Sequence, residues 1–334
     1  MPAAPWIIRL LLDASFAAHI LLVNVMLGLT LLGLVRSFRT EGNLGRMAGY
    51  IPNATALTVN LAIPPLLFLQ ALYGQFFYVS SSLMGVFWYV VVLAVMSAYG
   101  LAYWQKSRLS NGISRGRLVW ACMAALLLYV ALAQTNNALL AIRPDLWKGY
   151  FENPAGTLTA VSDPSFTPRW LHFVVASLAV GGLILALDGR KRVKRGESEG
   201  RAQVSAGMAW FAWATMVQIM DGLWFLISQP GPVRLAMLGG DAMSTALLVI
   251  GVGLAVMTLV FAFTGRVWPG AASLVTTVLA MVAIRDRVRA FALAPFYTMT
   301  THGVRPEYGT LVVFLACLVV TVAVVAWAVR GRQA

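Results

Sequence analysis

RWLHFVVASLAVGGLILALD, residues 169–188, is an apolar run about long enough to cross a bilayer as a helix. Its fourth residue, His172, is one of three histidines in the chain. An imidazole in lipid costs free energy unless a partner binds it. The small residues between Ala176 and Gly182 would let a flat ligand or another helix approach closely. An axial haem ligand requires a histidine in such a setting; a histidine hydrogen-bonded at the water interface is the alternative.

The composition places the whole chain in the class that this stretch indicates. Of its 334 residues, 60% are hydrophobic and 11% are charged, and the mean hydropathy is +0.78. We expect a multi-pass protein of the bacterial inner membrane, with a single transmembrane domain over residues 1–334. The net charge of +13 does not indicate a nucleic-acid partner, because the basic residues lie in short loops between apolar runs. Cys122 and Cys317 form no CxxC motif, so we expect no covalent c-type haem, zinc or iron–sulfur site on this chain.

The hydropathy pattern predicts an all-α polytopic bundle of about nine spanning helices. The expected bounds are 7–35, 53–76, 83–104, 118–140, 169–188, 206–228, 242–264, 271–289 and 309–329. Most Lys and Arg residues fall in the loops on one side, so the positive-inside rule puts these loops in the cytoplasm, the N-terminus outside and the C-terminus inside. The longest of these loops, 189–203, reads as a solvated charge run that matters only for topology.

Nearly all intramembrane polar side chains fall in the half of the bundle predicted to face outward. They include Asp13, His19, Gln134, Asn137, His172 and Asp221, and His302 follows in the outer loop before the last span. Polar groups buried in lipid mark functional sites more often than they serve packing. A polar outer vestibule, or hydrogen bonds between helices, is the alternative interpretation.

Three arginines on the predicted outer face, Arg285, Arg287 and Arg289, run against the positive-inside rule. We expect negatively charged groups to neutralise them. Haem propionates would do so, because guanidinium pairs bidentately with carboxylate. Asp286 alone could neutralise part of the charge.

Three segments resemble subunit I of the cytochrome bd quinol oxidases. They are DASFAAHILLVNVMLGLT at 13–30, AQTNN at 133–137 followed by Trp147 and Asn153-Pro154, and HFVVASLAVG at 172–181. The resemblance covers about half of the chain. It implies a nine-helix bundle with haems toward the outer face, His19 as a haem ligand and His172 as the ligand of the low-spin haem b.

The chain departs from that family where the family reduces oxygen. Residues 83–104 and 273–284 lack the carboxylates that the family carries there, and the segment after residue 228 is shorter than the family's quinol-binding loop. The family's methionine ligand has no clean counterpart: Met243 has about the right depth to oppose His172, and Met220 is the alternative. Ordinary packing is the other interpretation of both methionines.

Without those carboxylates we expect electron transfer rather than oxygen reduction. The expected protein is a membrane b-type cytochrome subunit with one or two haems b, or a third on His302, that passes electrons from quinol to an outer-face cytochrome c or iron–sulfur partner. Asp13 with His19, or Asp221, would accept the quinol proton. The arginines at 285, 287 and 289 would hold propionates or steer an acidic partner.

Two other functions stay open. One is a haem-free quinone-binding or transport subunit, whose pocket would be lined by Gln70, Gln75, Gln134 and Asn137. The lack of paired Gly/Pro-broken helices argues against a secondary transporter. The other is a bd-type oxidase in which His302 replaces the missing glutamate ligand.

Overall fold

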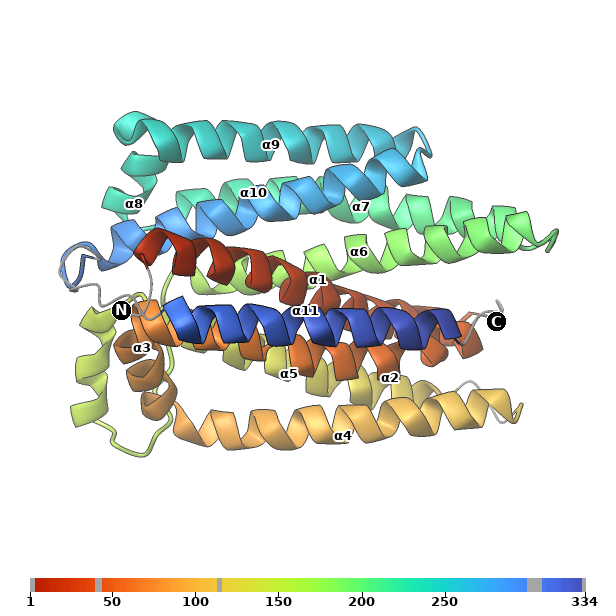
Figure 1. Cartoon of the computed structure of the whole chain (residues 1–334), viewed down its shortest axis with the longest axis horizontal. Coiled ribbons are helices and arrows are strands. Elements are labelled where there is room, and N and C mark those ends of the chain that lie inside the picture. Colours follow the sequence, from red (N-terminus) through yellow and green to blue (C-terminus); the bar gives the residue numbers. More distant parts are fainter. Residues whose placement is uncertain (1–3, 40–43, 113–115, 299–307, 332–334) are drawn as a thin grey trace.

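The computed structural model describes residues 4–39, 44–112, 116–298 and 308–331, with only some side chains in the last range. These residues form helices and no strand, and the long helices lie along one axis (Figure 1). The elements are α1 (Pro5–Ser37), α2 (Leu44–Leu61), α3 (Ile63–Leu83), α4 (Gly85–Ser110), α5 (Arg117–Leu140), η1 (Pro144–Phe151), α6 (Phe166–Lys194), α7 (Gly200–Ile227), α8 (Gly231–Leu235), η2 (Ala236–Gly240), α9 (Ala242–Phe263), α10 (Val267–Leu293) and α11 (Tyr308–Gly331). We call the left side of Figure 1 the N-terminal end of the bundle and the right side its C-terminal end.

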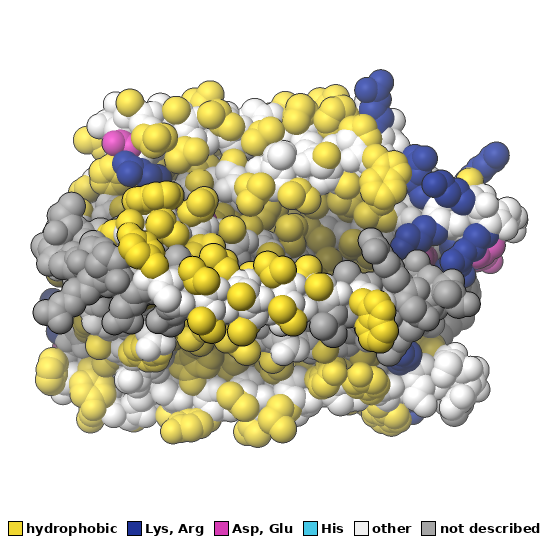
Figure 2. Space-filling view, viewed as in Figure 1, with side chains coloured by type: hydrophobic (Ala, Val, Ile, Leu, Met, Phe, Trp, Pro, Cys, Tyr) yellow, Lys and Arg dark blue, Asp and Glu magenta, His cyan; other side chains and the backbone are white. Residues whose placement is uncertain are grey.

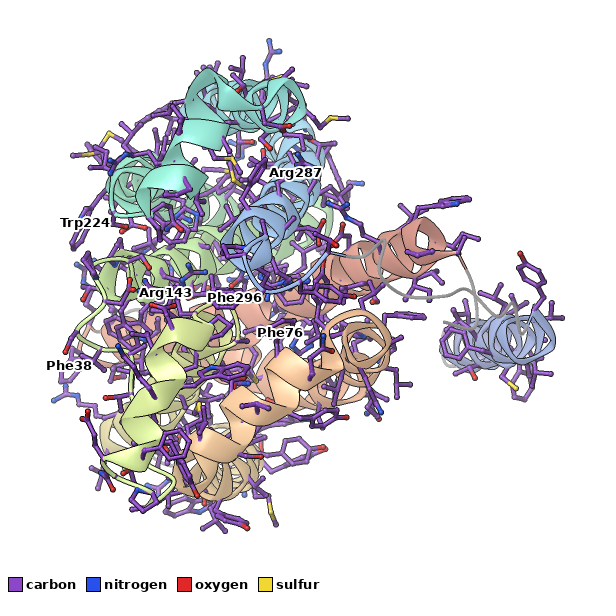
Figure 3. The ribbon with its side chains drawn as sticks, turned by 90° about the vertical axis from the view of Figure 1, so that its left-hand side faces the viewer. Phe38, Phe76, Arg143, Trp224, Arg287 and Phe296 are labelled. Carbon is purple, nitrogen blue, oxygen red and sulfur yellow. The ribbon has the colours of Figure 1, made fainter. Side chains whose placement is uncertain are left out.

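Eight segments of the described chain are long and apolar enough to cross a membrane, which confirms the predicted multi-pass helical class. Helices α2 and α3 together make one of them, Leu44–Leu83. The predicted ninth span corresponds to α11, of which Val312–Ala323 is described as a shorter apolar helix. In Figure 3 α11 stands apart from the other helices, and its Phe314 ring meets Phe68 of α3 with 5.7 Å between centroids.

The second span differs from the prediction of 53–76. It starts at Leu44 and is interrupted between Leu61 and Ile63, because Pro64 and Pro65 lack the N–H groups that would continue the hydrogen-bond ladder. Helix α3 bends again at Tyr73, where φ is −137°, and its last turns cross the N-terminal end (Figure 1). A hydropathy pattern registers apolar length and does not register such changes of direction.

Helix α1 occupies the centre and packs against α2, α3, α5, α6 and α10. Its contact with α6 requires glycine: a Cβ on Gly28 would overlap the backbone carbonyl of Ser177, and one on Gly181 would lie 2.8 Å from the carbonyl carbon of Gly28. The α6–α7 pair is equally close, since a Cβ on Gly207 would lie 2.5 Å from the backbone nitrogen of Ala186. These crossings fix the register of α1, α6 and α7.

The surface follows the pattern of a membrane protein. Apolar side chains cover the length of the visible face, while Lys and Arg side chains gather at the C-terminal end (Figure 2). Exposed large apolar residues include Leu93, Met96, Val249, Val260 and Trp268. A surface of this kind is stable in lipid rather than in water.

Candidate functional site

His172 and Asp221 meet across the α6–α7 pair near the N-terminal end. Nδ1 of His172 lies 2.9 Å from Oδ2 of Asp221. The Asp221 side chain is 5% exposed and that of His172 is 28% exposed. An ionised carboxylate can only accept a hydrogen bond, so Nδ1 donates and the lone pair of the neutral imidazole resides on Nε2. Nε2 is therefore the atom that can bind a ligand.

His19 has the same tautomer for a different reason. Its Nδ1 lies 3.1 Å from the backbone carbonyl oxygen of Thr58 in α2. A carbonyl oxygen only accepts, so Nε2 again carries the lone pair. Metal-binding histidines commonly show these two arrangements, in which the second ring nitrogen is held by a carboxylate or by a backbone carbonyl.

The two histidines lie at the same depth in the bundle. Helices α1 and α6 run in the same direction (Figure 1), and Gly28 crosses α6 at Gly181. His19 precedes Gly28 by nine residues and His172 precedes Gly181 by nine residues. At 1.5 Å per residue, both histidines stand about 13 Å from the crossing, toward the N-terminal end.

An ion cluster occupies the same end, between α1 and α10. Asp286 forms ion pairs with Arg9 and with Arg289, the latter at 3.7 Å. Asp13 interacts electrostatically with Arg9, Arg285, Arg289 and Asp286. The structure therefore places Asp13 against α10 and does not join it to His19, because the two residues face different sides of α1.

Aromatic rings surround this cluster. The guanidinium of Arg285 lies over the Phe16 ring at 4.2 Å, and that of Arg289 lies over the Tyr73 ring at 4.9 Å. Tyr73 packs with Tyr297, whose hydroxyl donates to the carbonyl of Leu72 at 2.9 Å. Such rings accept the face of a guanidinium and exclude water from it.

Arg169 is the least compensated charge at this end. It is 8% exposed, and its guanidinium lies 4.8 Å from the centre of the Phe225 ring. Its Nε and Nη2 have no hydrogen-bond partner within the described ranges. It interacts with Asp163, which is itself bound by Arg143, and it is repelled by Arg285.

The ion cluster carries one more positive than negative formal charge. Arg9, Arg285 and Arg289 share the carboxylates of Asp13 and Asp286. Arg169 interacts instead with Asp163, which also binds Arg143. Buried charge of one sign is costly without a partner, so this arrangement suits an anionic ligand.

Arg287 does not belong to this cluster. Residues 285 and 289 share a helix face, whereas residue 287 lies about 200° around α10. Arg287 binds Asp241 at 2.7 Å and the Ser244 hydroxyl at 3.0 Å, which ties α10 to the start of α9 (Figure 3). The joint role predicted for the three arginines is thus wrong for Arg287 on geometric grounds.

The other predicted site residues lie elsewhere or are exposed. Asn137 accepts from Ser80 at 2.7 Å and donates to Ser81 at 3.2 Å, so its amide joins α5 to α3. Gln134 is half-buried one turn earlier. Met243 and Met220 are 62% and 65% exposed. His302 lies outside the described residues.

Met237 is a residue that the sequence did not single out. It is fully buried in η2, a single π-helical turn. Such turns recur at functional sites. No periodic signal could have separated Met237 from the other methionines, because it lies in a short turn between helices.

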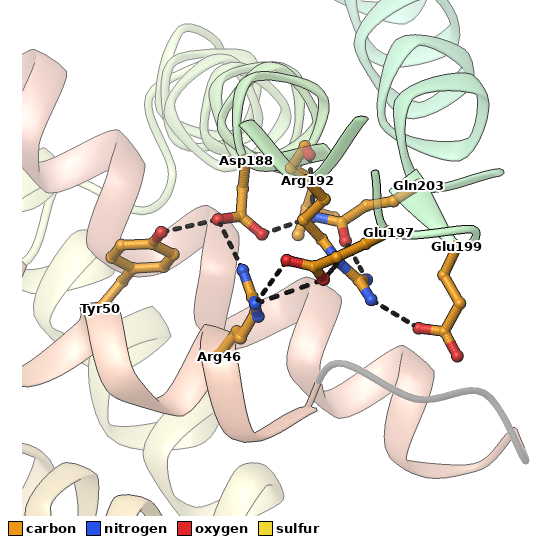
Figure 4. A network of polar contacts seen from close by, with 8 residues as sticks. Arg46, Tyr50, Asp188, Arg192, Glu197, Glu199 and Gln203 are labelled. Carbon is orange, nitrogen blue, oxygen red and sulfur yellow. Dashed lines mark hydrogen bonds and ion pairs between the residues drawn. The ribbon is translucent and has the colours of Figure 1, made fainter. Parts of the chain in front are cut away.

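A second polar network lies at the C-terminal end (Figure 4). Asp188 accepts hydrogen bonds from Tyr50 at 2.7 Å and from Gln203 at 2.8 Å, and it lies 3.6 Å from Arg46. Arg192 is buried and bonds to Gln203 at 2.8 Å.

Most of the charged residues of the 189–203 run are exposed, which fits a solvated run, but Arg192 and Gln203 are buried. Besides Gln203, Arg192 binds Glu197 and Glu199, each at 2.7 Å. The network anchors α2 to the α6–α7 pair and so supports the helix register that joins His172 to Asp221.

Within the described residues, no group of three or more His, Cys, Asp or Glu side chains could hold a metal ion. A haem needs only one or two side chains as iron ligands. The residues that fit one are His172 and His19, each held through Nδ1, and the buried Arg169. No protein-family model matches this chain, and no curated protein matches it.

Proposed function

We propose that the chain is the membrane b-type cytochrome subunit of a respiratory electron-transfer complex, which exchanges electrons between the quinone pool and a cytochrome c or iron–sulfur partner. One observation carries the proposal: His172 is held through Nδ1 by the buried Asp221, and one turn away Nε and Nη2 of the buried Arg169 have no hydrogen-bond partner among the described residues. A purely structural histidine would not require that arginine. The resemblance to subunit I of the cytochrome bd oxidases points the same way.

The residues suited to hold a haem are His172 and Arg169, with Arg285 beside them. His172 would bind the haem iron, and Asp221 would fix the orientation of the imidazole and raise its basicity. A haem carries two propionates, which the guanidinium groups of Arg169 and Arg285 would bind. His19 would bind the iron of a second haem. Haem b held there would take up and return single electrons.

Oxidation of a quinol to a quinone releases two electrons and two protons, so the site needs proton acceptors. Oδ1 of Asp221 is buried without a hydrogen-bond partner among the described residues, while Oδ2 is held by His172. Asp221 would therefore accept a proton at Oδ1. Asp13, within the arginine cluster, would be the second acceptor.

The basic residues at the C-terminal end support an orientation in which that end faces the cytoplasm of a bacterium and the haem end faces outward. Electrons would then leave at the outer face. The proposed electron transfer would take place within a hetero-oligomeric complex that supplies the outer-face partner.

The test is a dithionite-reduced minus oxidised spectrum of the purified protein with a pyridine haemochrome count. We expect a b-type α band that carbon monoxide does not shift. His172→Ala should abolish one haem, and His302→Ala is the control that should leave the spectrum unchanged. A carbon monoxide shift would favour an oxidase. The absence of any Soret band would refute the haem and leave a haem-free quinone-binding or transport subunit.

A further inference from the structure

Helix α7 carries two buried side-chain oxygens beside His172 that lack a donor. Asp221 bonds to His172 through Oδ2, and its Oδ1 has no hydrogen-bond partner among the described residues. Gln218 lies one turn earlier, and its buried Oε1 also has no such partner. The proposed electron transfer gives Gln218 no role. Buried acceptors without donors are costly, so a pair of them suits a ligand that donates hydrogen bonds.

Helical geometry brings the two oxygens to neighbouring positions on α7. Side chains three residues apart on a helix are neighbours, with about 5–6 Å between their Cβ atoms. Gly222, one turn after Gln218, faces the histidine, because a Cβ built on it would lie 3.5 Å from Cε1 of His172. Phe225 follows on the same row and packs against His172 with 5.9 Å between ring centroids. Gln218 therefore lies on the side of α7 that faces α6, about one turn deeper than His172.

A ligand has room beside this row and a route to it. Outside its own helix, a Cβ built on Gly222 would approach within 4 Å only the imidazole of His172, among the described residues. Val217 and Trp224, one turn before and after Asp221 on the helix surface, are exposed. Trp224 lies at the periphery of the bundle (Figure 3). Asp221 thus borders the lipid-facing side of α7, from which an apolar molecule can enter.

We propose that Gln218 is a substrate-binding residue, which accepts a hydrogen bond from one quinol hydroxyl while Oδ1 of Asp221 accepts one from the other. This inference rests on the proposed function, which makes quinol the substrate. The two hydroxyls stand on opposite sides of one ring, so two acceptors one helical turn apart can bind both. The apolar tail of the quinol would remain in the lipid. The site then recognises its ligand by its hydroxyl groups.

Anaerobic isothermal titration calorimetry of the purified full-length protein in detergent tests the proposal. The ligands are decylubiquinol and its dimethyl ether, which keeps the ring and the tail but donates no hydrogen bond. We expect the wild type to bind the quinol at least about tenfold more tightly than the ether. Q218L should weaken quinol binding about three- to tenfold and leave ether binding unchanged, because only the quinol loses a hydrogen bond. The control N60L removes an amide from an exposed position of α2 and should bind both ligands as the wild type does.

Three results would overturn the proposal. They are equal binding of the quinol and the ether by the wild type, unchanged quinol binding by Q218L, and equal weakening of both ligands by Q218L, which would indicate a structural glutamine. The measurement does not require haem. A protein without a Soret band in which Q218L still loses its preference for the quinol would refute the haem and retain the quinol site. A haem protein whose quinol binding does not depend on Gln218 would retain the electron-transfer proposal and refute this one.

Discussion

The substitution Arg169→Met tests whether the buried charge of Arg169 binds an anion or has no function. In the ligand-free protein, Nε and Nη2 of Arg169 are buried without a hydrogen-bond partner among the described residues, and each such group costs about 1–3 kcal/mol. The contact with the Phe225 ring, 4.8 Å away, offsets about 0.5–2 kcal/mol of this cost. Methionine fills a similar volume without charge. We therefore expect the substitution to stabilise the ligand-free protein by roughly 1–4 kcal/mol, as replacements of buried ions by apolar residues often do.

The same substitution should have the opposite effect on the haem-loaded protein. On the proposed function it would remove the partner of a propionate, and a charge-assisted hydrogen bond contributes about 1.5–3 kcal/mol. The assay is the free energy of unfolding in detergent, for protein from haem-depleted and haem-supplemented cells. Arg287→Met is the matched control, because Arg287 is paired with Asp241 and its loss should destabilise both forms. The reasoning fails if Arg169→Met destabilises the ligand-free protein, or if haem retention is unchanged.

Three further outcomes are expected. Asp221→Asn keeps the size of the side chain but weakens its bond to His172, so haem affinity should fall about 10–100-fold in a haem-transfer assay, whereas Asp13→Asn should leave the His172-bound haem in place. Gly28→Leu should lower the free energy of unfolding by at least about 1–3 kcal/mol, because a side chain there meets the backbone of α6; Gly49→Leu, in open space, is the control, and equal losses would contradict the close crossing. Ser244 and Arg287 hold the pKa of the Asp241 carboxyl below its usual range. Since the folded pKa is depressed, this stabilisation is present above about pH 4 and is lost as the pH falls through the folded pKa. The difference in melting temperature between wild type and Asp241→Asn should therefore be largest near neutral pH and shrink in acid; a constant difference would contradict it.

The helical membrane class could be predicted because hydropathy is local and additive along the chain. A run such as 169–188 is apolar whatever it packs against, and a helix is the structure that satisfies its backbone in lipid. The same reasoning brought out His19, His172 and Asp221, since polar groups are conspicuous within apolar runs. Hydropathy also left features out. It ended the fifth span at residue 188, whereas α6 continues to Lys194, and it did not predict the break at Pro64 and Pro65.

The partner of each polar side chain was decided by tertiary structure. His172 and Asp221 are 49 residues apart, and they meet because glycines let α6 and α7 approach closely. Arg287 leaves the arginine cluster because α10 turns its side chain toward α9. A hydrogen bond depends on helix rotation and register, which follow from packing at distant crossings and are not encoded in the hydropathy of any one segment. The sequence alone determined that this protein is an apolar helical bundle with polar groups toward one end, and its tertiary packing determined which of those groups form a site.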